Sequence, residues 1–145
     1  ALQSLREVLK PGGTLTVIEG DHGSAFFHPE SRHASDAILA LESLQRYSGG
    51  NPRIGRELYP LLTSSGFHDV QVSPRQVYVD DSKPSLVEGF TRQTFTAMVE
   101  GVREKVITSG MMPEEDFDRG IRDLYRTSEG GGTFCYTFYK AVAVR

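Results

Sequence analysis

Three residues whose side chains can hold or move protons lie close together early in the chain, in the segment "TLTVIEGDHGS". Glu19, Asp21 and His22 end a run of β-branched and apolar residues. An ordinary imidazole titrates near neutral pH, so His22 can accept a proton from a bound substrate while Asp21 or Glu19 orients its ring. The alternative is structural, because Asp and His side chains also bond to backbone groups in loops. The sequence leaves both interpretations open.

The position of this cluster predicts where a ligand would bind. Residues 14 to 20 are β-branched and largely apolar, which is typical of a strand covered on both faces. Ligands of an open α/β sheet bind beyond the carboxyl ends of its strands. We therefore expect substrate groups to lie just past this strand, beside Asp21 and His22.

Other catalytic chemistries are disfavoured. His28 and His33 lie near Asp21 and His22, but their spacing gives no i, i+4 pair of the kind that zinc sites use, so we expect no metal. The single cysteine, Cys135, belongs to the alternating stretch "TFCYTFYKAVAV", which favours a buried strand residue over a nucleophile. No GxSxG motif is present, which argues against a serine hydrolase.

Length and composition indicate one globular domain covering residues 1–145. Hydrophobic residues make up 38% of the chain and charged residues 24%, enough to bury a core. The net charge of −3, without a block of Lys or Arg, argues against nucleic acid as a partner. No apolar run approaches the ~20 residues that span a membrane, and no secretory signal opens the sequence. We expect a cytoplasmic protein without a membrane partner.

Apolar periodicity and the Gly and Pro positions predict an α/β order of elements with a helix-rich middle. The helices are expected over residues 1–9, from Pro29 to Gly49, from Pro52 to Gly66 with a kink or late start at Pro60, from Ser82 to Ser109, and from Pro113 to about 128. Strands are expected over residues 14–20, over 68–80 with an interruption at Ser73-Pro74, and over 133–144.

Two motifs and their order resemble the second half of a class I S-adenosylmethionine-dependent methyltransferase. In that family a helix ending "LKPGG" leads into the fifth strand, and here Leu9–Gly13 match it. A helix ending in a small residue, Gly and Phe leads into the sixth strand, and here Ser65–Phe67 match it. The closing antiparallel strand of the fold corresponds to "TFCYTFYKAVAVR". The resemblance covers essentially the whole chain.

The resemblance implies a partial Rossmann-like methyltransferase sheet with strands equivalent to five, seven and six, the last one in the chain being antiparallel. The glycine-rich turn that holds the cofactor in this family is not found in the sequence, because Gly130–Gly132 precede a strand instead of opening a helix. The S-adenosylmethionine site is therefore expected largely outside this chain. An open edge where strand four would pair predicts a dimer or larger assembly.

The helical segments 24–51 and 82–128 are additions to a minimal sheet, and in the resembled family such additions form a lid over the methyl acceptor. Aromatic side chains of these segments would contact a small-molecule acceptor and exclude water; the candidates are Phe26, Phe27, Tyr47 and Tyr125. Arg75 and Arg126 would bind an acidic group on it. The alternatives are that the aromatic residues belong to the core and that the arginines form surface ion pairs.

Two functions follow. The first is the acceptor-binding C-terminal part of a methyltransferase that acts on a small molecule and is inactive or weakly active without its cofactor-binding half. The second is a non-catalytic α/β module that associates with itself through the open sheet edge.

Overall fold

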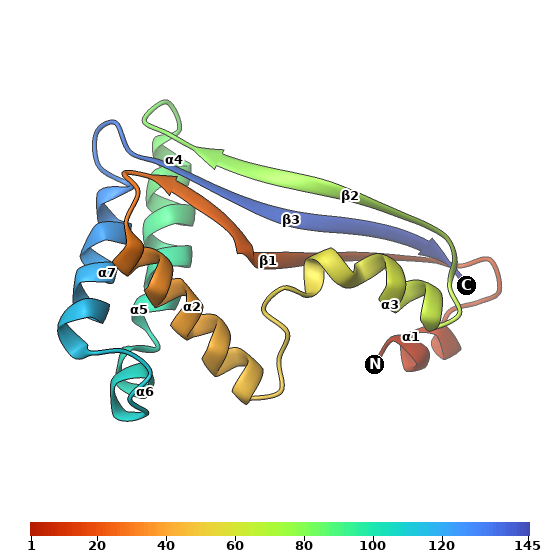
Figure 1. Cartoon of the computed structure of the whole chain (residues 1–145). Coiled ribbons are helices and arrows are strands. Elements are labelled where there is room, and N and C mark those ends of the chain that lie inside the picture. Colours follow the sequence, from red (N-terminus) through yellow and green to blue (C-terminus); the bar gives the residue numbers. More distant parts are fainter.

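The computed structural model describes all residues from Ala1 to Arg145 and confirms the α/β class. The sheet has three strands, β1 (Thr14–His28), β2 (His68–Val79) and β3 (Thr133–Val144). Their order is β1-β3-β2, and β3 is antiparallel to both neighbours, so that β1 and β2 run in the same direction (Figure 1). The last strand of the chain is therefore the central one, and β1 and β2 each have one edge without a strand partner.

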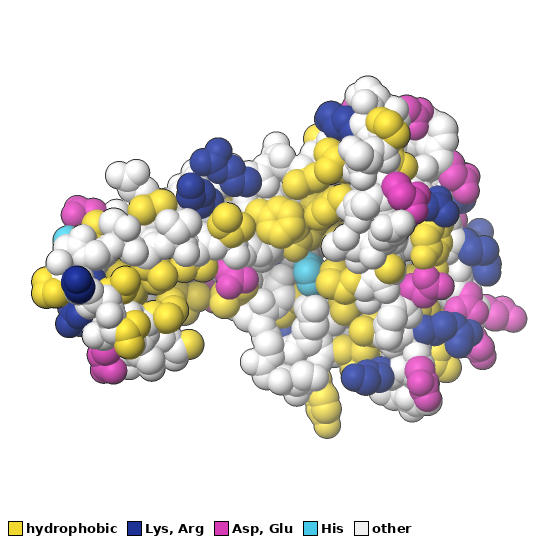
Figure 2. Space-filling model, turned by 180° about the vertical axis from the view of Figure 1, so that it is seen from behind, with side chains coloured by type: hydrophobic (Ala, Val, Ile, Leu, Met, Phe, Trp, Pro, Cys, Tyr) yellow, Lys and Arg dark blue, Asp and Glu magenta, His cyan; other side chains and the backbone are white.

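The helices form two groups at opposite ends of this long sheet (Figure 1). The smaller group contains α1 (Leu2–Val8), the 3₁₀ helix η1 (Ile54–Glu57) and α3 (Leu58–Ser64). The larger group contains α2 (Arg32–Tyr47), α4 (Pro84–Leu86), the π-helix η2 (Val87–Thr96), α5 (Ala97–Glu100), α6 (Arg103–Thr108) and α7 (Glu114–Arg126). Seen from behind, hydrophobic side chains gather in the middle of the molecule, between the two ends (Figure 2).

Each helical group covers a different face of β3, because successive strand residues point to opposite sides. Phe134 and Tyr136 belong to the large core beneath α2, η2 and α7. Ala141 and Ala143 belong to a small core with Leu62 of α3. The two cores thus lie on opposite faces of β3, and near its start Cys135 and Thr137, which point away from the large core, are buried as well.

The polar cluster lies within a strand, which corrects the prediction that it follows one. β1 continues through Asp21 and His22 to His28, with an irregularity in its pairing to β3. Between the pairs Asp21–Thr137 and Phe26–Cys135, β1 advances five residues while β3 advances two. The extra residues form a bulge, which redirects side chains locally.

Side chains stabilise this bulge by replacing missing ladder hydrogen bonds. The Gly23 N–H donates to Asp21 Oδ1 at 3.0 Å, and the Ser24 hydroxyl donates to the Asp21 carbonyl at 2.6 Å. Ser24 Oγ also accepts the Thr137 N–H at 2.9 Å. Asp and Ser favour such local bonds, which is why the strand bends here without ending.

Other boundaries also differ from expectation. The helix predicted from Pro29 begins at Arg32, after Ser31, whose Oγ accepts the Ala34 N–H. A hydroxyl at the N-cap satisfies a free backbone donor of the first turn, which a proline cannot do. The late start beside Pro60 is confirmed, since α3 begins at Leu58 after a 3₁₀ turn.

The predicted long helix over 82–109 is divided, and the expected break in β2 is absent. The predicted helix consists of α4, the π-helix η2, α5 and, after a turn at Gly101, α6. Its first turn begins at Pro84, and the N-cap is Lys83 instead of Ser82. β2 runs unbroken through Pro74, because β2 is an edge strand and a proline there can direct its missing N–H outward.

Candidate functional site

The site is built around the His22 imidazole, which the bulge directs toward the larger helical group. Its Nδ1 lies 2.8 Å from the hydroxyl of Tyr136 on β3, and its Nε2 lies 3.3 Å from the Gln45 amide nitrogen on α2. The ring also meets Phe95 edge-on, with centroids 6.1 Å apart. Groups from two strands, α2 and η2 therefore fix the ring.

The Tyr136 hydroxyl reaches His22 because it passes directly over a glycine. A Cβ on Gly20 would overlap the Tyr136 hydroxyl oxygen, so any larger residue at this position would push the ring away. Burial, with the nearby negative charge of Asp21, raises the pKa of Tyr136 well above its ordinary value of 10.0. The phenol therefore stays protonated at physiological pH.

The His22 ring is a neutral base at physiological pH. Burial lowers its pKa below the ordinary 6.5, and the charges of Glu42 and Asp21 offset part of this effect. The Gln45 amide nitrogen faces Nε2 and can only donate, so this arrangement has the ring proton on Nδ1, toward the Tyr136 oxygen, and leaves Gln45 Oε1 buried without a partner. In this tautomer Nε2 is the basic nitrogen, and its contact to Gln45 is the longer of the two.

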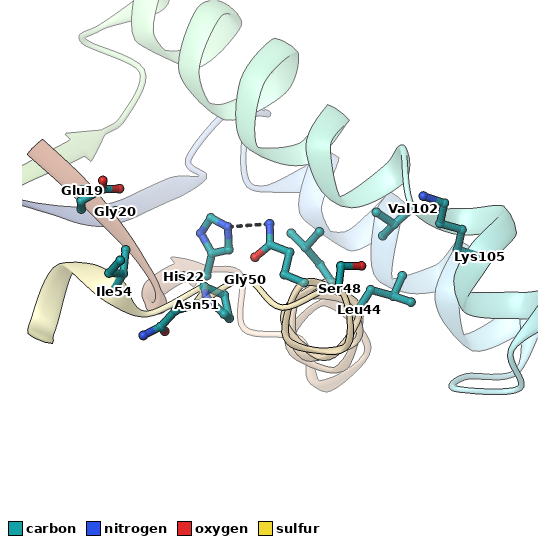
Figure 3. A pocket seen from close by; sticks show the side chains of 13 residues that line it. Glu19, Gly20, His22, Leu44, Ser48, Gly50, Asn51, Ile54, Val102 and Lys105 are labelled. Atoms are coloured by element: carbon teal, nitrogen blue, oxygen red, sulfur yellow. Dashed lines mark hydrogen bonds between the residues drawn. The ribbon is translucent and has the colours of Figure 1, made fainter. Parts of the chain in front are cut away.

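A cavity of about 510 Å³ opens beside His22, between β1, the end of α2, the loop that follows it and α6 (Figure 3). Thirteen residues line it: Glu19, Gly20, His22, Leu41, Leu44, Gln45, Ser48, Gly50, Asn51, Pro52, Ile54, Val102 and Lys105. Six of these side chains are polar, and two of them, Ser48 and Lys105, lie beside Leu44 and Val102, away from His22 (Figure 3). The hydrophobic part of the wall comes from leucine, isoleucine and valine side chains. This combination is typical of a pocket for a small organic molecule.

No protein-family model matches this sequence, and no curated protein matches it either. The interpretation of the site therefore depends on its geometry and on the motif resemblance described above.

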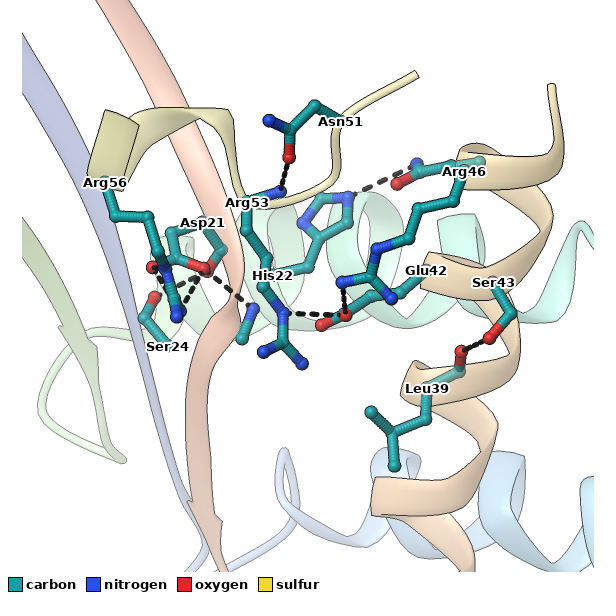
Figure 4. A network of polar contacts seen from close by, with 12 residues as sticks. Asp21, His22, Ser24, Leu39, Glu42, Ser43, Arg46, Asn51, Arg53 and Arg56 are labelled. Atoms are coloured by element: carbon teal, nitrogen blue, oxygen red, sulfur yellow. Dashed lines mark hydrogen bonds and ion pairs between the residues drawn. The ribbon is translucent and has the colours of Figure 1, made fainter. Parts of the chain in front are cut away.

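Asp21 is part of an ion pair and does not contact the His22 ring. Its carboxylate is 2% exposed and accepts two hydrogen bonds from Arg56, each 2.8 Å long (Figure 4). Such a bidentate pair fixes η1 against the bulge of β1. Glu19 lines the cavity, but it makes no hydrogen bond or ion pair to His22. The residues that orient His22 are Tyr136 and Gln45.

The aromatic residues predicted to contact the acceptor lie elsewhere. Phe26 is 57% exposed, and Phe27 stacks on Phe134; both line a separate, more polar depression of about 560 Å³ near the start of α2. Tyr47 is 89% exposed at the end of α2. Tyr125 donates its hydroxyl to Glu100 on the far side of the helical group. None of them lines the 510 Å³ cavity, and only Phe27 lines a smaller cavity of about 170 Å³ that also touches His22.

The two predicted arginines are also distant from His22. Arg75 is exposed on β2, and Arg126 forms an exposed ion pair with Asp123. The basic group at the cavity is instead Lys105 of α6. The sequence analysis missed Lys105, Gln45 and Tyr136, although Gly20 next to a candidate site is a signal that another group approaches the backbone there.

No group of three or more His, Cys, Asp or Glu side chains is arranged to hold a metal ion. None of the helices combines the length and apolar character needed to cross a membrane.

Proposed function

We propose that this chain is the acceptor-binding part of an S-adenosylmethionine-dependent methyltransferase that acts on a small molecule. The observation that carries the proposal is a neutral imidazole, bonded to Tyr136, at the wall of a cavity that has both polar and apolar side chains. Methyl transfer to an O–H or N–H group requires removal of a proton, alignment and exclusion of water. His22 can remove the proton, and the cavity can align the acceptor and exclude water.

The arrangement of the sheet supports the same proposal. The "LKPGG" motif precedes β1, the "SGF" motif precedes β2, and the last strand pairs antiparallel between the two. The resembled family orders its fifth, seventh and sixth strands in this way. The helices α2 and α6 at the cavity wall belong to segments 24–51 and 82–128, which supports their role as a lid.

The residues of this chain do not form a cradle for the cofactor. β1 leads into α2 through Pro29–Ser31, and β2 leads into α4 through Asp80–Lys83, without a glycine in either connection. A glycine-rich turn that opens a helix is what lets a backbone approach a nucleotide closely. We therefore assign S-adenosylmethionine to residues outside this chain.

The proposed chemistry of this chain is proton removal. An acceptor hydroxyl or amine in the cavity would replace Gln45 as the partner of His22 Nε2, because that contact is the longer one. Nε2 would take the acceptor proton, while Nδ1 remains bonded to Tyr136 and the ring stays oriented. Lys105 would attract an acceptor of negative charge into the cavity.

The test is methyl transfer by the intact protein from radiolabelled S-adenosylmethionine to a panel of small hydroxylated and amino compounds. We expect His22→Gln to lower turnover by about 10² to 10⁴, the usual contribution of a general base. His68→Gln, at an exposed histidine on β2, is the matched control. Unchanged turnover in the His22 variant would remove this residue as the base. Calorimetric titration of S-adenosylmethionine into this chain alone should give no heat.

A second candidate function is favoured by one observation, the open edge of β1. This edge has no strand partner, and Ile18 beside it is 59% exposed. An unpaired edge with apolar side chains invites pairing with another strand. The chain would then act as a self-associating module, and the mass of the chain in solution tests this directly.

A further inference from the structure

One buried carboxylate oxygen near His22 has no partner. Glu42 on α2 is fully buried, and its Oε2 accepts hydrogen bonds from Arg53 Nε at 2.8 Å and Arg46 Nη2 at 2.9 Å (Figure 4). Its other oxygen, Oε1, is buried without a hydrogen-bond partner. Buried polar atoms are nearly always satisfied, and a charged one is the costliest to leave alone. Oε1 therefore has unused capacity to accept a hydrogen bond, and because Glu42 is 0% exposed, a donor from outside the chain must displace a neighbouring side chain to reach it.

Glu42 lines a cavity of about 170 Å³ that lies on another side of His22 from the larger one. Its polar lining comes from Glu42, His22, Arg53 and Ser35, and Gly23 also lines it. Its apolar lining consists of Ala25, Phe27, Ile38 and Leu39. The cavity thus offers both polar and apolar groups to a small organic molecule.

The guanidinium of Arg53 has two terminal nitrogens that can bind an anion in this cavity. Its Nε is bonded to Glu42, but neither terminal nitrogen of its guanidinium makes a hydrogen bond within the chain. A Cβ on Gly23 would lie 2.7 Å from Arg53 Nε, so this glycine is what allows the guanidinium to lie against the bulge. Free guanidinium nitrogens bind carboxylates with well-defined geometry.

The charges around the cavity favour an anion over a simple cation. Two carboxylates, Asp21 and Glu42, face three guanidinium groups, those of Arg46, Arg53 and Arg56. One positive charge is left in excess. A ligand that carries both a hydrogen-bond donor for Glu42 and a negative charge for Arg53 would satisfy both unused groups.

We propose that this cavity binds a small amino- or hydroxy-carboxylate. The amine or hydroxyl of the ligand donates to Glu42 Oε1, its carboxylate binds the terminal nitrogens of Arg53, and a short apolar side chain packs on Phe27 and Leu39. The proposal does not depend on methyl transfer, because it rests only on groups of this chain and concerns binding alone.

The test is a titration of the ¹⁵N-labelled chain, followed through the amide signals of His22 and Gly23. The probes are 2-hydroxy-3-methylbutanoate and L-valine, compared with 3-methylbutanoate, which lacks the donor, and 2-methylpropan-1-ol, which lacks the carboxylate. We expect at least one of the first two to bind tenfold or more tightly than both comparison compounds, about the value of a hydrogen bond to a charged group. Equal binding of 3-methylbutanoate, or no shift with any probe, would overturn the proposal.

A variant adds a second test. In Glu42→Gln the two arginines would hold the amide oxygen, which turns the NH₂ group toward the cavity and removes the acceptor. The preference for the hydroxy or amino acid should then disappear, whereas Ser43→Ala, at the exposed next residue of α2, should retain it. Retained preference in Glu42→Gln would contradict the role of Oε1. The comparison of probes on the unchanged chain stands by itself if this variant does not fold.

Discussion

The Tyr136 hydroxyl lies 2.8 Å from Nδ1 of His22, although the two residues are 114 positions apart in the sequence. The contact crosses from the central strand to the bulge of its neighbour, directly over Gly20. It leaves Nε2 as the ring nitrogen that can exchange its partner for a ligand. Several consequences of this geometry can be measured on the chain itself.

Removal of the Tyr136 hydroxyl should remove the hydrogen bond that orients the His22 ring and leave the packing of the core unchanged. In Tyr136→Phe the apolar contacts remain, and Nδ1 loses its partner at a cost of about 1 kcal/mol. We expect the ¹⁵N signals of the imidazole to change from one dominant tautomer to a mixture. Tyr78→Phe, at a half-exposed tyrosine of β2 whose hydroxyl makes no hydrogen bond, should change neither stability nor these signals. An unaltered His22 spectrum in Tyr136→Phe would contradict the positioning role.

Gly20 should tolerate no side chain. Gly20→Ala would force its Cβ against the Tyr136 hydroxyl, and overpacking of this kind costs about 1–3 kcal/mol. Gly89→Ala is the control, because no atom lies within 4 Å of a Cβ at that position. That variant should be neutral or slightly stabilising, since alanine favours a helical backbone. Urea unfolding of both variants gives the comparison, and equal stabilities would refute the close approach.

The stability of the chain should depend on the protonation of His22. Its pKa is lowered in the folded state, chiefly by burial, so the unfolded chain binds this proton more readily. Stability is therefore greatest above the ordinary pKa of 6.5 and falls as the pH drops below that value, until the folded-state pKa is passed. Unfolding free energies at pH 7.5 and at pH 5 measure the loss. His22→Gln should reduce this loss, and an equal loss in that variant would contradict the contribution of His22.

The local pattern of the sequence was enough to predict the strands, because alternating and β-branched residues form them whatever lies far away. The same holds for the order of the elements and for the start of α3 near Pro60. The bulge of β1 was not predictable, since it depends on Asp21 and Ser24 bonding to backbone groups that a regular strand would pair. The pattern at 14–20 indicates a strand but not where it ends.

The site was predicted in part. His22 and Glu19 were identified from residue type and position, and both line the larger cavity. Tyr136 was not identified, because its contact depends on the pairing of β1 with β3 and not on spacing along the chain. The Asp21 carboxylate was expected near the imidazole, but a nearby arginine competes for it more strongly than a neutral ring does.

The Arg56–Asp21 pair should be essential for stability. The Arg56 side chain is 44% exposed, but Arg56→Ala would leave a carboxylate that is 2% exposed without its bidentate partner, and an unsatisfied buried acceptor costs about 1–3 kcal/mol. Arg103→Ala removes the same number of atoms from an exposed network with Asp118 and Glu114. Exposed pairs contribute little, so that variant should lose much less stability. Thermal or urea unfolding that ranks the two variants in the opposite order would contradict the structural role of Asp21.

The open edge of β1 predicts self-association that a single charge can prevent. Ile18 is 59% exposed beside this edge, and a second copy pairing there would bury it. Ile18→Lys would bring two positive charges together across a symmetric pair, and charged side chains protect natural edge strands in the same way. We expect the chain to have the mass of a dimer or larger species by light scattering, and Ile18→Lys to have that of a monomer. Tyr59→Lys, which removes an equally exposed apolar residue from α3, should leave the mass unchanged. A monomeric unchanged chain, or an Ile18→Lys variant that stays associated, would mean that the edge of β1 is not the surface that joins the copies.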